Sequence, residues 1–570
     1  MRLPKKISVS EKHLKSTPNV ADYQKFYKSF DIEAEAKAQL EYFDHEHLNA
    51  AYNAVERHAY NENKNKVALY LVSDDLKEEI VTFSKLNELS NQFGNLLKSL
   101  EVAKGDRVFF FLPRVAAVFY GFLGTLKVGA IAGTLFSAFG PQALLDRLGT
   151  SNAKVLITTK ELLPRVAKVK RKLPDLQHII LLEDLEKLLS KQSTELYCAH
   201  TLATDPAFML FTSGTTGKPK GIVHAHQAIV QQHLTAKYVL DLKPDDVYWC
   251  TADPGWVTGI AYQILGTLSN AISTVVFSGR FDPKIWYQLL EKFKVTVWYT
   301  APTAIRMLQA AGDDLVRFHN LSSLRHLGSV GEPLNPEPLV WGHRVFKHPF
   351  HDTWWQTETG AIMIANYPNL EIRPGSMGKP FPGVHAAIVD DKGHELPDLI
   401  EGNLAVKKGW ISQMIKVWRR PTKFKSYFVK GWYLSGDRAF KDKDGYFWFV
   451  GRADDVIKTM GERVGPFEVE SALVSHDQVI EAGVIGKPDA LRGQIIKAFV
   501  VLKEGIKPTE KLKLEIADHV KHILAGHAYP REIEFIDKLP KTKSGKIVRR
   551  LLRAKELGLP LGDTSTLEEF

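Results

Sequence analysis

Residues 211–221 read F-T-S-G-T-T-G-K-P-K-G, and this stretch decides how the rest of the chain is interpreted. The apolar run 208–211 leads into it and is short enough to be one buried strand. Glycines let backbone N–H groups approach an anion closely, hydroxyl groups donate hydrogen bonds, and lysines add positive charge. The composition fits a phosphate cradle, but it also fits a glycine-rich surface turn with two solvated lysines, so both interpretations stay open at this point.

Two familiar nucleotide loops are excluded. A Walker A loop needs a Ser or Thr after its G-K pair, whereas Lys218 is followed by Pro219. No G-x-G-x-x-G follows a predicted strand, so a Rossmann dinucleotide site has no support. The string T-S-G-T-T-G-K-P-K-G does resemble the signature loop of the adenylate-forming superfamily, which includes acyl-CoA synthetases, peptide-synthetase adenylation domains and luciferases.

Composition sets the broad class. The chain has 570 residues, 44% of them apolar and 25% charged, with a formal net charge of +10. These values are ordinary for a globular protein of several domains, and the positive balance favours anionic partners such as nucleic acid, an anionic surface or polyanionic small substrates. The charge is spread along the chain except near the C-terminus, so nucleic-acid binding is only weakly indicated.

The chain contains two cysteines, Cys198 and Cys250, too few for a disulfide framework or a cysteine-rich metal site. The first residues lack the apolar core of a signal peptide. The most apolar run, residues 115–126, is shorter than the roughly 20 residues that span a bilayer, so we expect a buried helix there. These features predict a cytoplasmic protein without a membrane segment.

Strand and helix patterns alternate over the first half of the chain. We expect strands at 66–72, 107–112, 129–135 and 154–158, with helices at 83–100 and 115–126, and an amphipathic helix at 48–58. This order predicts an α/β fold with largely parallel sheets sandwiched by helices. After the apolar run 447–450, charges and glycines suggest a boundary, so we expect a large domain at 1–453 and a small mobile α+β domain at 454–570.

Five further strings stand out. They are V-Y-W-C-T-A-D-P-G-W-V-T-G at 247–259, G-S-V-G-E-P-L-N-P at 328–336 after a predicted strand at 324–327, Y-L-S-G-D at 433–437, G-R-A-D-D-V-I-K-T-M-G-E-R-V-G at 451–465 and P-K-T-K-S-G-K at 540–546. A sixth, H-D-T-W-W-Q-T-E-T-G at 351–360, places acids, threonines and tryptophans together in what we expect to be one loop. Loops on rigid scaffolds often carry function.

These motifs occur in the order expected of adenylate-forming enzymes. Together with the 48–58 string and the tail L-G-D-T-S-T-L at 561–567, they resemble most specifically the acetyl-CoA synthetase family, the AMP-forming acetate–CoA ligases. The resemblance implies acetate, ATP and CoA as substrates and Mg²⁺ as cofactor. It also implies two steps: acetate attacks the α-phosphorus of ATP and releases pyrophosphate, and CoA then attacks the acetyl-adenylate and releases AMP.

The resemblance also implies a nucleotide site. The β- and γ-phosphates would lie on Thr212, Ser213, Gly214, Thr215, Thr216, Gly217 and Lys220. The adenine, ribose and α-phosphate would be contacted by Gly331, Glu332, Pro333, Asp352, Thr353, Trp354, Trp355, Gln356, Thr357, Asp437, Arg452 and Arg463. Glu358 would hold Mg²⁺, since a hard cation prefers carboxylate and phosphate oxygens. An ionised Asp437 could accept both ribose hydroxyls.

Lys546 is the main catalytic prediction. By composition it is one of many solvated lysines, but the family motif implies that it stabilises charge at the transferring phosphoryl group. The same position would be switched off by an acetyltransferase and restored by a deacetylase, because acetylation removes its charge. Asp454 would be the hinge about which the small domain rotates before CoA reacts.

The implied CoA site includes Thr258, Met460, Gly461 and Lys521. Met460 departs from the family, where a small serine is usual, and Lys521 stands where an arginine is usual, so a bidentate fork is lost there. The resemblance further implies a cation on the backbone carbonyls of Val474, His476 and Val479. In the acyl pocket, Trp355 would limit chain length to acetate or propionate, and Trp256, Val257, Thr258 and Val330 would form the other walls. Without the resemblance, a core aromatic is the favoured interpretation of Trp256.

Several alternatives remain from the sequence. One is a medium-chain or aryl acyl-CoA ligase, against which Trp355 argues. Another is a nucleotide-sensing or nucleic-acid-binding protein using the basic tail 538–555, which lacks aromatics for base stacking. A P-loop NTPase is disfavoured by Pro219. His224 and His226 could suggest a metal, but no third ligand is evident, which favours a structural role.

Overall fold

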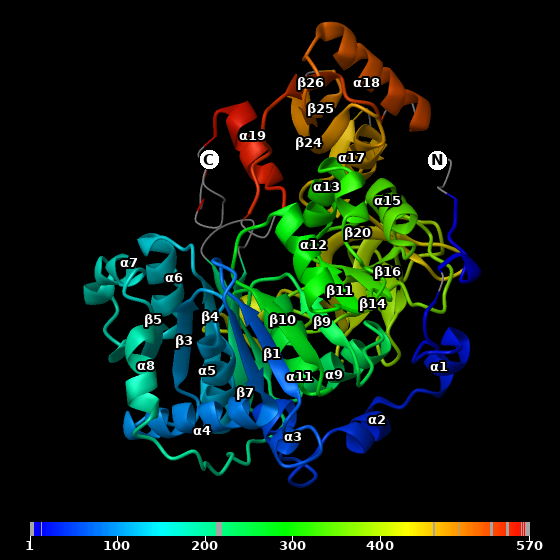
Figure 1. Cartoon of the computed structure of the whole chain (residues 1–570). Helices are drawn as coiled ribbons and strands as arrows, with labels where there is room; N and C mark the ends of the chain where they lie inside the picture. Colours follow the sequence, from blue (N-terminus) through cyan, green and yellow to red (C-terminus); the bar gives the residue numbers. More distant parts are fainter. Residues whose placement is uncertain are drawn as a thin grey trace.

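A computed structural model describes residues 5–12, 14–212, 219–459, 462–489, 491–524, 528–542, 546–559, 561 and 564. Over these residues the chain forms a large body built on two sheets and a smaller C-terminal unit with a third sheet (Figure 1). No helix in the described ranges has both the length and the apolar character needed to cross a membrane.

The largest sheet has a parallel half and an antiparallel half. Strands β1, β10, β9, β11, β12 and β13 pair in parallel, and from β13 onward each pairing through β14, β15, β21, β20, β17 and β16 is antiparallel. In pairing order the strands are β16 (Ala386–Val389), β17 (Gly402–Lys407), β20 (Trp432–Lys441), β21 (Phe447–Arg452), β15 (Ser376–Pro380), β14 (Ile364–Ala365), β13 (Phe350–Trp354), β12 (His326–Ser329), β11 (Val297–Thr300), β9 (Val247–Cys250), β10 (Ser273–Phe277), β1 (Val67–Val72) and β2 (Glu78–Thr82), with β19 (Phe428–Val429) beside β20.

The second sheet is parallel over β7, β4, β3, β5 and β6, with β8 and β18 added antiparallel at one edge. Its strands in pairing order are β18 (Lys416–Val417), β8 (Lys220–Ala225), β7 (Pro206–Thr212), β4 (Ile131–Phe136), β3 (Arg107–Leu112), β5 (Val155–Thr158) and β6 (His178–Leu181). The predicted strand 107–112 matches β3, and both sheets confirm the predicted α/β class.

The two sheets face each other across a central helical layer (Figure 1). Val108 and Phe110 of β3 point into this central core, whereas Phe109 points into the core on the outer face. The same period-two alternation puts Tyr299 of β11 in the central core and Trp298 in the outer core of the large sheet. Parallel strands buried on both faces favour long apolar runs, as in β3, where residues 108–112 are all apolar and buried.

The helices follow from this layering. The central layer holds η2 (Tyr52–Glu56), α3 (Arg57–Ala59), α4 (Phe83–Ser99), α5 (Ala116–Lys127), α9 (Ala228–Tyr238), η4 (Ile260–Leu265) and α11 (Gly266–Leu268). Other helices are α6 (Pro141–Ser151), α7 (Leu163–Ala167), η3 (Lys170–Lys172), α8 (Leu182–Leu189), α10 (Val257–Gly259), α12 (Pro283–Lys292), α13 (Pro302–Ala310), α14 (Asp314–Arg317), α15 (Pro336–Phe346) and α16 (Pro421–Lys425). Every residue of α5 is buried, which confirms the predicted buried helix.

Three sequence expectations are wrong in detail. The 48–58 string is not amphipathic, because η2 and α3 are largely buried, and η2 has π-helical hydrogen bonding. The 351–360 string is not one loop: its first residues belong to β13, where parallel pairing with β12 draws polar residues into a strand. The strand predicted at 324–327 begins later, at His326.

The N-terminal segment lies against the large body through η1 (Ser10–Lys12), α1 (Tyr23–Ser29) and α2 (Ile32–Gln39). Lys12 is fully buried and its ammonium donates hydrogen bonds to the carbonyls of Tyr367, Pro368 and Leu370. Burial lowers the pKa of Lys12 to about 7. This contact ties the segment to the antiparallel half of the large sheet.

The C-terminal unit begins after β21. A turn at 453–455 leads to β22 (Ile457–Thr459) and β23 (Glu462–Val464), and the sheet is completed by β24 (Val479–Asp489), β25 (Gly493–Leu502) and β26 (Glu532–Phe535). Its helices are α17 (Pro466–Val474), α18 (Glu510–Ile523) and α19 (Arg549–Leu557). A separate apolar core lies between this sheet and α17 and α18, which is the packing expected of an α+β unit.

Candidate functional site

The first wall of the site follows β12. Gly331 has a φ of +95°, a backbone conformation that favours glycine, and the chain turns sharply there. The turn presents Glu332, whose carboxylate accepts hydrogen bonds from Thr303 Oγ1 at 2.7 Å and from Arg306 Nη2 at 3.0 Å. The glycine-rich string at 328–336 therefore forms a fixed loop rather than a free connector.

The neighbouring strand β13 supplies Asp352, Thr353 and Trp354, all less than 9% exposed. Burial raises the pKa of the Asp352 carboxyl to about 7, and its Oδ1 has no partner among the described residues. A buried unpaired carboxyl atom with a raised pKa is characteristic of a functional site. Asp352 and Glu332 lie on adjacent strand ends because β12 and β13 are parallel partners.

Asp437 on β20 joins three segments of the site. Its Oδ2 accepts from Trp354 Nε1 at 2.9 Å and from Gln356 Nε2 at 3.0 Å, and its Oδ1 accepts from Arg452 Nη1 at 2.8 Å. Asp437 and Arg452 are cross-strand neighbours on β20 and β21, and Asp437 is buried. A carboxylate has about four acceptor positions, so these three bonds leave about one for a ligand.

His224 contacts the backbone of the turn that carries Thr357 and Glu358. Its Nε2 lies 2.7 Å from the carbonyl oxygen of Thr357, and its Nδ1 lies 3.1 Å from that of Ser412. Burial lowers the pKa of His224 to about 4, so at neutral pH the ring is uncharged and donates to only one carbonyl. The sequence predicted a structural role for His224, but it did not reveal the contact with the turn that carries Thr357 and Glu358.

His226 lies elsewhere, with its Nδ1 accepting from the backbone N–H of Ala50 at 3.1 Å. Among the residues the structure describes, no group of three or more His, Cys, Asp or Glu side chains is placed to hold a metal. Both histidines are fully buried within the central layers.

The glycine-rich string spans two antiparallel strands. Thr212 ends β7 and pairs with Lys220 at the start of β8. The predicted phosphate contacts Ser213, Gly214, Thr215, Thr216 and Gly217 lie outside the described residues.

Trp355 lies in an aromatic wall. Its ring meets Tyr262 edge-on at 5.2 Å between centroids, and its Nε1 donates to Tyr299 Oη at 3.3 Å. The hydroxyl of Tyr299 contacts Thr353 Oγ1 at 2.7 Å, and Thr353 donates to the carbonyl of Ser329 at 2.8 Å. One hydrogen-bond chain thus connects the predicted acyl pocket to the predicted adenine wall.

Tyr262 and Tyr299 were missed from the sequence, although Tyr262 follows the predicted wall residue Thr258 by four positions, one turn of helix. Val257 begins α10 and is half-buried, and Thr258 and Val330 are buried. Trp256 packs against Phe136 with centroids 6.0 Å apart. Trp256 is half-buried, and its place in the acyl-pocket wall remains a prediction.

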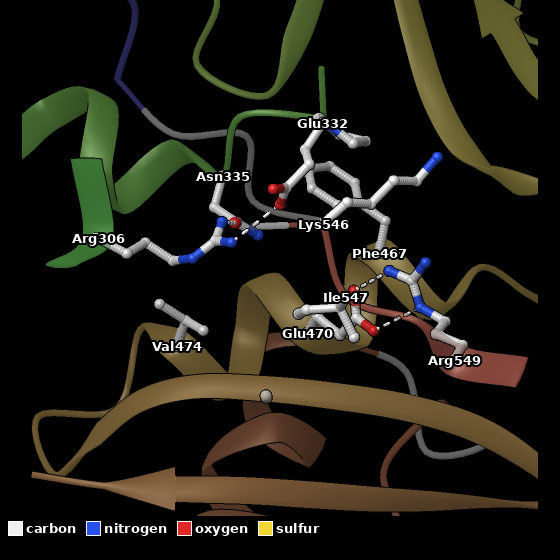
Figure 2. A pocket seen from close by; sticks show the side chains of 11 residues that line it. Arg306, Glu332, Asn335, Phe467, Glu470, Val474, Lys546, Ile547 and Arg549 are labelled. Atoms are coloured by element: carbon white, nitrogen blue, oxygen red, sulfur yellow. Dashed lines mark hydrogen bonds and ion pairs between the residues drawn. The ribbon is translucent and has the colours of Figure 1, made fainter. Parts of the chain in front are cut away.

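Lys546 comes from the C-terminal unit and lines a small cavity between it and the large body (Figure 2). One side of this cavity belongs to the large body and is lined by Arg306, Glu332, Pro333 and Asn335. The other side belongs to the C-terminal unit and is lined by Phe467, Glu470, Ile547 and Arg549. The Lys546 side chain is exposed to solvent. Desolvation by the surrounding protein is the main cause that lowers the pKa of Lys546, and the positive Arg452 guanidinium lowers it further. The Asp437 and Glu332 carboxylates act in the opposite direction.

Other predicted residues are not brought to this cavity or are not described. Arg463 is exposed on β23, and Lys521 on α18 lies 5.7 Å from the centre of the Tyr529 ring. The carbonyl of His476 accepts from the N–H of Val479 at 2.9 Å, and Val474 ends α17. Asp454 lies in the turn after β21 and is 46% exposed. Met460 and Gly461 lie outside the described residues.

Comparison with known proteins identifies the class. Residues 55–415 match the family described as AMP-binding enzyme, and residues 468–546 match the AMP-binding enzyme C-terminal domain. The chain belongs to this family of AMP-binding enzymes. The crystal structure of a Brucella canis acyl-CoA synthetase is 36% identical, with a TM-score of 0.74, covering 94% of this chain and 99% of that one.

Within the family, the similarity to one group is high. The chain is 53% identical to the acetyl-coenzyme A synthetase of Bacillus subtilis over 97% of its own length and 98% of that protein. It is 42% identical to the acetyl-coenzyme A synthetase of Methanothrix thermoacetophila, over 91% of this chain and 84% of that protein. An anthranilate CoA ligase solved with anthranoyl-AMP has a TM-score of 0.83 at 33% identity, over 89% and 97% of the two chains.

Proposed function

We propose that this enzyme ligates acetate to CoA through an acetyl-adenylate, consuming ATP and releasing pyrophosphate and AMP. The observation that carries the proposal is the continuity of the segment from Asp352 to Glu358. Its successive residues contact the Asp437 carboxylate, close an aromatic pocket with Trp355 and end at the turn held by His224. A nucleotide and a small acid bound along this segment would meet end to end. The 53% identity to an acetyl-coenzyme A synthetase supports acetate as the acid.

In the first step we assign nucleotide binding to the wall residues. Glu332 and Asp352 would flank the adenine, and Asp437 would accept from the ribose. Since Asp437 already accepts from three protein donors, one of them, Gln356 or Arg452, must give way if both ribose hydroxyls bind. Thr357 would contact the α-phosphate. Lys220, Thr212 and the adjoining loop would take the β- and γ-phosphates.

Glu358 is the proposed Mg²⁺ ligand. Its Oε1 accepts a hydrogen bond from Tyr427 Oη at 3.2 Å, and the other carboxylate oxygen has no described donor on it. A partly exposed carboxylate beside the phosphate loop suits a hard cation. When bound, Mg²⁺ would supply charge neutralisation between phosphate oxygens. The backbone carbonyls of Val474, His476 and Val479 remain a prediction for a second cation.

Lys546 is the proposed catalytic cation of the first step. Acetate oxygen forms a bond to the α-phosphorus while the bond to the bridging oxygen breaks, and the electron pair leaves with pyrophosphate. A positioned ammonium stabilises the charge that develops around the phosphoryl group. The placement of Lys546 in a cavity wall beside Glu332 supports this role (Figure 2).

For the second step we propose rotation of the unit 454–570 about Asp454. Lys546 would leave, and Met460 and Gly461 would approach with CoA, whose thiolate attacks the acyl carbonyl so that AMP departs. Arg463 would then reach the α-phosphate and Lys521 the CoA phosphate. The exposed position of Arg463 on β23, away from the Lys546 cavity, is compatible with a role reserved for this second arrangement.

Cellular context follows from the same chemistry. The two described cysteines are free and buried, and ATP and CoA are intracellular substrates, so we place the enzyme in the cytoplasm. An exposed Lys546 also suits reversible acetylation by a protein acetyltransferase and deacetylase.

The test is acetate-dependent exchange of pyrophosphate into ATP, followed by AMP release once CoA is added. We expect both activities, with acetate preferred over hexanoate. Exchange that proceeds without acetate, or release of ADP, would contradict the proposal. Preference for hexanoate or benzoate would favour a medium-chain or aryl ligase instead.

A further inference from the structure

Tyr427 contacts three charged groups: Glu358, Lys423 and Lys220 at the start of β8. Its hydroxyl donates to Glu358 Oε1 at 3.2 Å. The ammonium of Lys423 lies 4.8 Å from the centre of its ring, and that of Lys220 lies 6.0 Å from the same centre. Both distances are within the range in which a cation is attracted to an aromatic ring. Tyr427 therefore holds two ammonium groups near one carboxylate.

Among the residues that the structure describes, the two lysines beside Tyr427 have no direct ion-pair partner, and only the more distant Glu358 carboxylate offsets the repulsion that Lys220 experiences from the neighbouring cations. Across the described ranges, neither Lys220 nor Lys423 is within ion-pair distance of a carboxylate. Lys220 is half-buried, and its pKa is lowered first by desolvation and next by Lys423, which shows that the two cations repel each other. Holding two unpaired, partly desolvated cations together is unfavourable unless an anion joins them.

The location identifies the anion. Lys220 is the last lysine of the glycine-rich string, and Glu358 is the proposed Mg²⁺ ligand, so both lysines lie on a tyrosine that contacts a residue of the proposed phosphate site. Lys423 comes from α16, more than two hundred residues away in sequence, and the string itself gives no hint of it.

We propose that Lys423, together with Lys220, binds the pyrophosphate portion of ATP and the departing pyrophosphate, and that Tyr427 positions Lys423. This inference rests on the proposed function and adds to it a residue from a separate segment. When the α-phosphorus bond to the bridging oxygen breaks, the electron pair stays on that oxygen of pyrophosphate. Lys423 would neutralise this charge as a point-charge phosphate binder.

The chain offers a matched control in Lys425, on the same short helix. Lys425 is exposed, whereas Lys423 is half-buried on the Tyr427 ring. Lys423→Ala and Lys425→Ala remove the same charge from neighbouring positions, so they alter the general field of the surface almost equally. Only Lys423→Ala should weaken the binding of pyrophosphate.

The experiment measures acetate-dependent ATP–pyrophosphate exchange with varied pyrophosphate, ATP and acetate. For Lys423→Ala we expect the KM for pyrophosphate to rise about tenfold, as loss of a charged hydrogen bond predicts, with the KM for ATP rising and that for acetate unchanged. Lys423→Arg should restore most of the affinity. Lys425→Ala should match the wild type, and thermal unfolding should confirm that each variant is folded.

A second variant tests the positioning role. Tyr427→Leu removes the ring that holds Lys423, so its KM for pyrophosphate should rise in the same direction, and Lys423→Ala should add little in the double variant. Equal KM values for pyrophosphate in Lys423→Ala and Lys425→Ala would overturn the inference. Absence of acetate-dependent exchange in the wild type would instead overturn the proposed function, so the two failures are distinguishable.

Discussion

Two regions meet at the candidate site, and they are built differently. The nucleotide wall, formed by the ends of β12, β13, β20 and β21, holds its functional side chains buried and hydrogen-bonded, with Asp437 only 4% exposed. The lysine arm consists of the described residues 541–542 and 546–547 of the C-terminal unit, where Lys541 pairs with Ile547 and Lys546 is exposed. A buried wall keeps a ligand in one orientation, whereas an exposed arm can deliver a group and withdraw it.

Among the described residues, Lys541 and Thr542 make contacts that hold the arm. Lys541 pairs with Glu481 at 2.6 Å, both side chains being 8% exposed, and the N–H of Thr542 donates to the carbonyl of Lys546 at 2.8 Å. Glu481 also lies 3.8 Å from Arg306 of α13, which binds Glu332 in the turn after β12. Arg306 therefore links the two regions, because it contacts both Glu481, which binds Lys541 of the arm, and Glu332 in the turn of the wall. We call this contact the joint.

The largest effect is expected from Lys546 on the arm. Lys546→Ala removes the proposed catalytic ammonium, and we expect ATP–pyrophosphate exchange to fall about 100–1,000-fold, the usual loss for a positioned electrostatic group. Conversion of supplied acetyl-adenylate and CoA to acetyl-CoA should persist, because that step would use the other arrangement. Lys555→Ala, on exposed α19, is the control for loss of a positive charge. Unimpaired exchange in Lys546→Ala would remove Lys546 from the mechanism.

Within the wall, the strongest effect concerns acyl length. Trp355→Gly deletes the indole that packs on Tyr262 and should open the pocket beyond acetate. The ratio of kcat/KM for hexanoate over acetate should rise about 100-fold, since each buried methylene changes selectivity by roughly 10-fold or more. Tyr262→Phe keeps the ring and serves as control. An unchanged ratio would mean that Trp355 is not the floor of the pocket.

The joint between the regions should give an intermediate effect. Glu481→Gln leaves Lys541 and Arg306 with a neutral partner, so the arm should dock less firmly. We expect exchange to fall about tenfold, while the thioester step from supplied acetyl-adenylate changes little. The control is Glu515→Gln, which removes an exposed carboxylate on α18. Equal loss in both steps would indicate general damage rather than a joint.

The same contrast explains what the sequence could predict. Apolar runs predicted β3 and α5 well, because burial on both faces is written in the residues themselves. The family motifs led to Asp437 and Lys546. The strand β13 was missed because its polar residues resemble a loop, and only pairing with β12 determines otherwise.

Contacts between segments that are far apart in the chain could not be predicted from the sequence. Arg306 meets Glu481, Tyr299 meets Trp355, and Tyr427 meets Glu358 across large separations in the chain. Trp355 and Glu358 belong to the string at 351–360, but their partners Tyr299 and Tyr427, and the pair Arg306 and Glu481, belong to no quoted string. Their roles arise from packing, which a single sequence does not record.

The smallest effect on turnover is expected from Asp352, deep in the wall. Its pKa is raised from about 3.8 in an unfolded chain to about 7 by burial. Between these values the folded state binds more protons than the unfolded state, so the free energy of unfolding falls as pH rises from about 4 to 7 and then levels off. Asp352→Asn cannot ionise, so this contribution to the pH dependence should disappear.

We expect the drop in the free energy of unfolding between pH 5 and pH 8 to be about 1–2 kcal/mol smaller in Asp352→Asn than in the wild type, measured by urea titration at each pH. Exchange activity should change only a few-fold, because an amide keeps a similar shape. Asp314→Asn, at an 83% exposed position, is the control and should leave the drop unaltered. A larger drop in Asp352→Asn would mean that the wall stabilises the ionised carboxylate. Asp352 would then resemble Asp437, whose charge is met by three donors, rather than an acid kept neutral by burial.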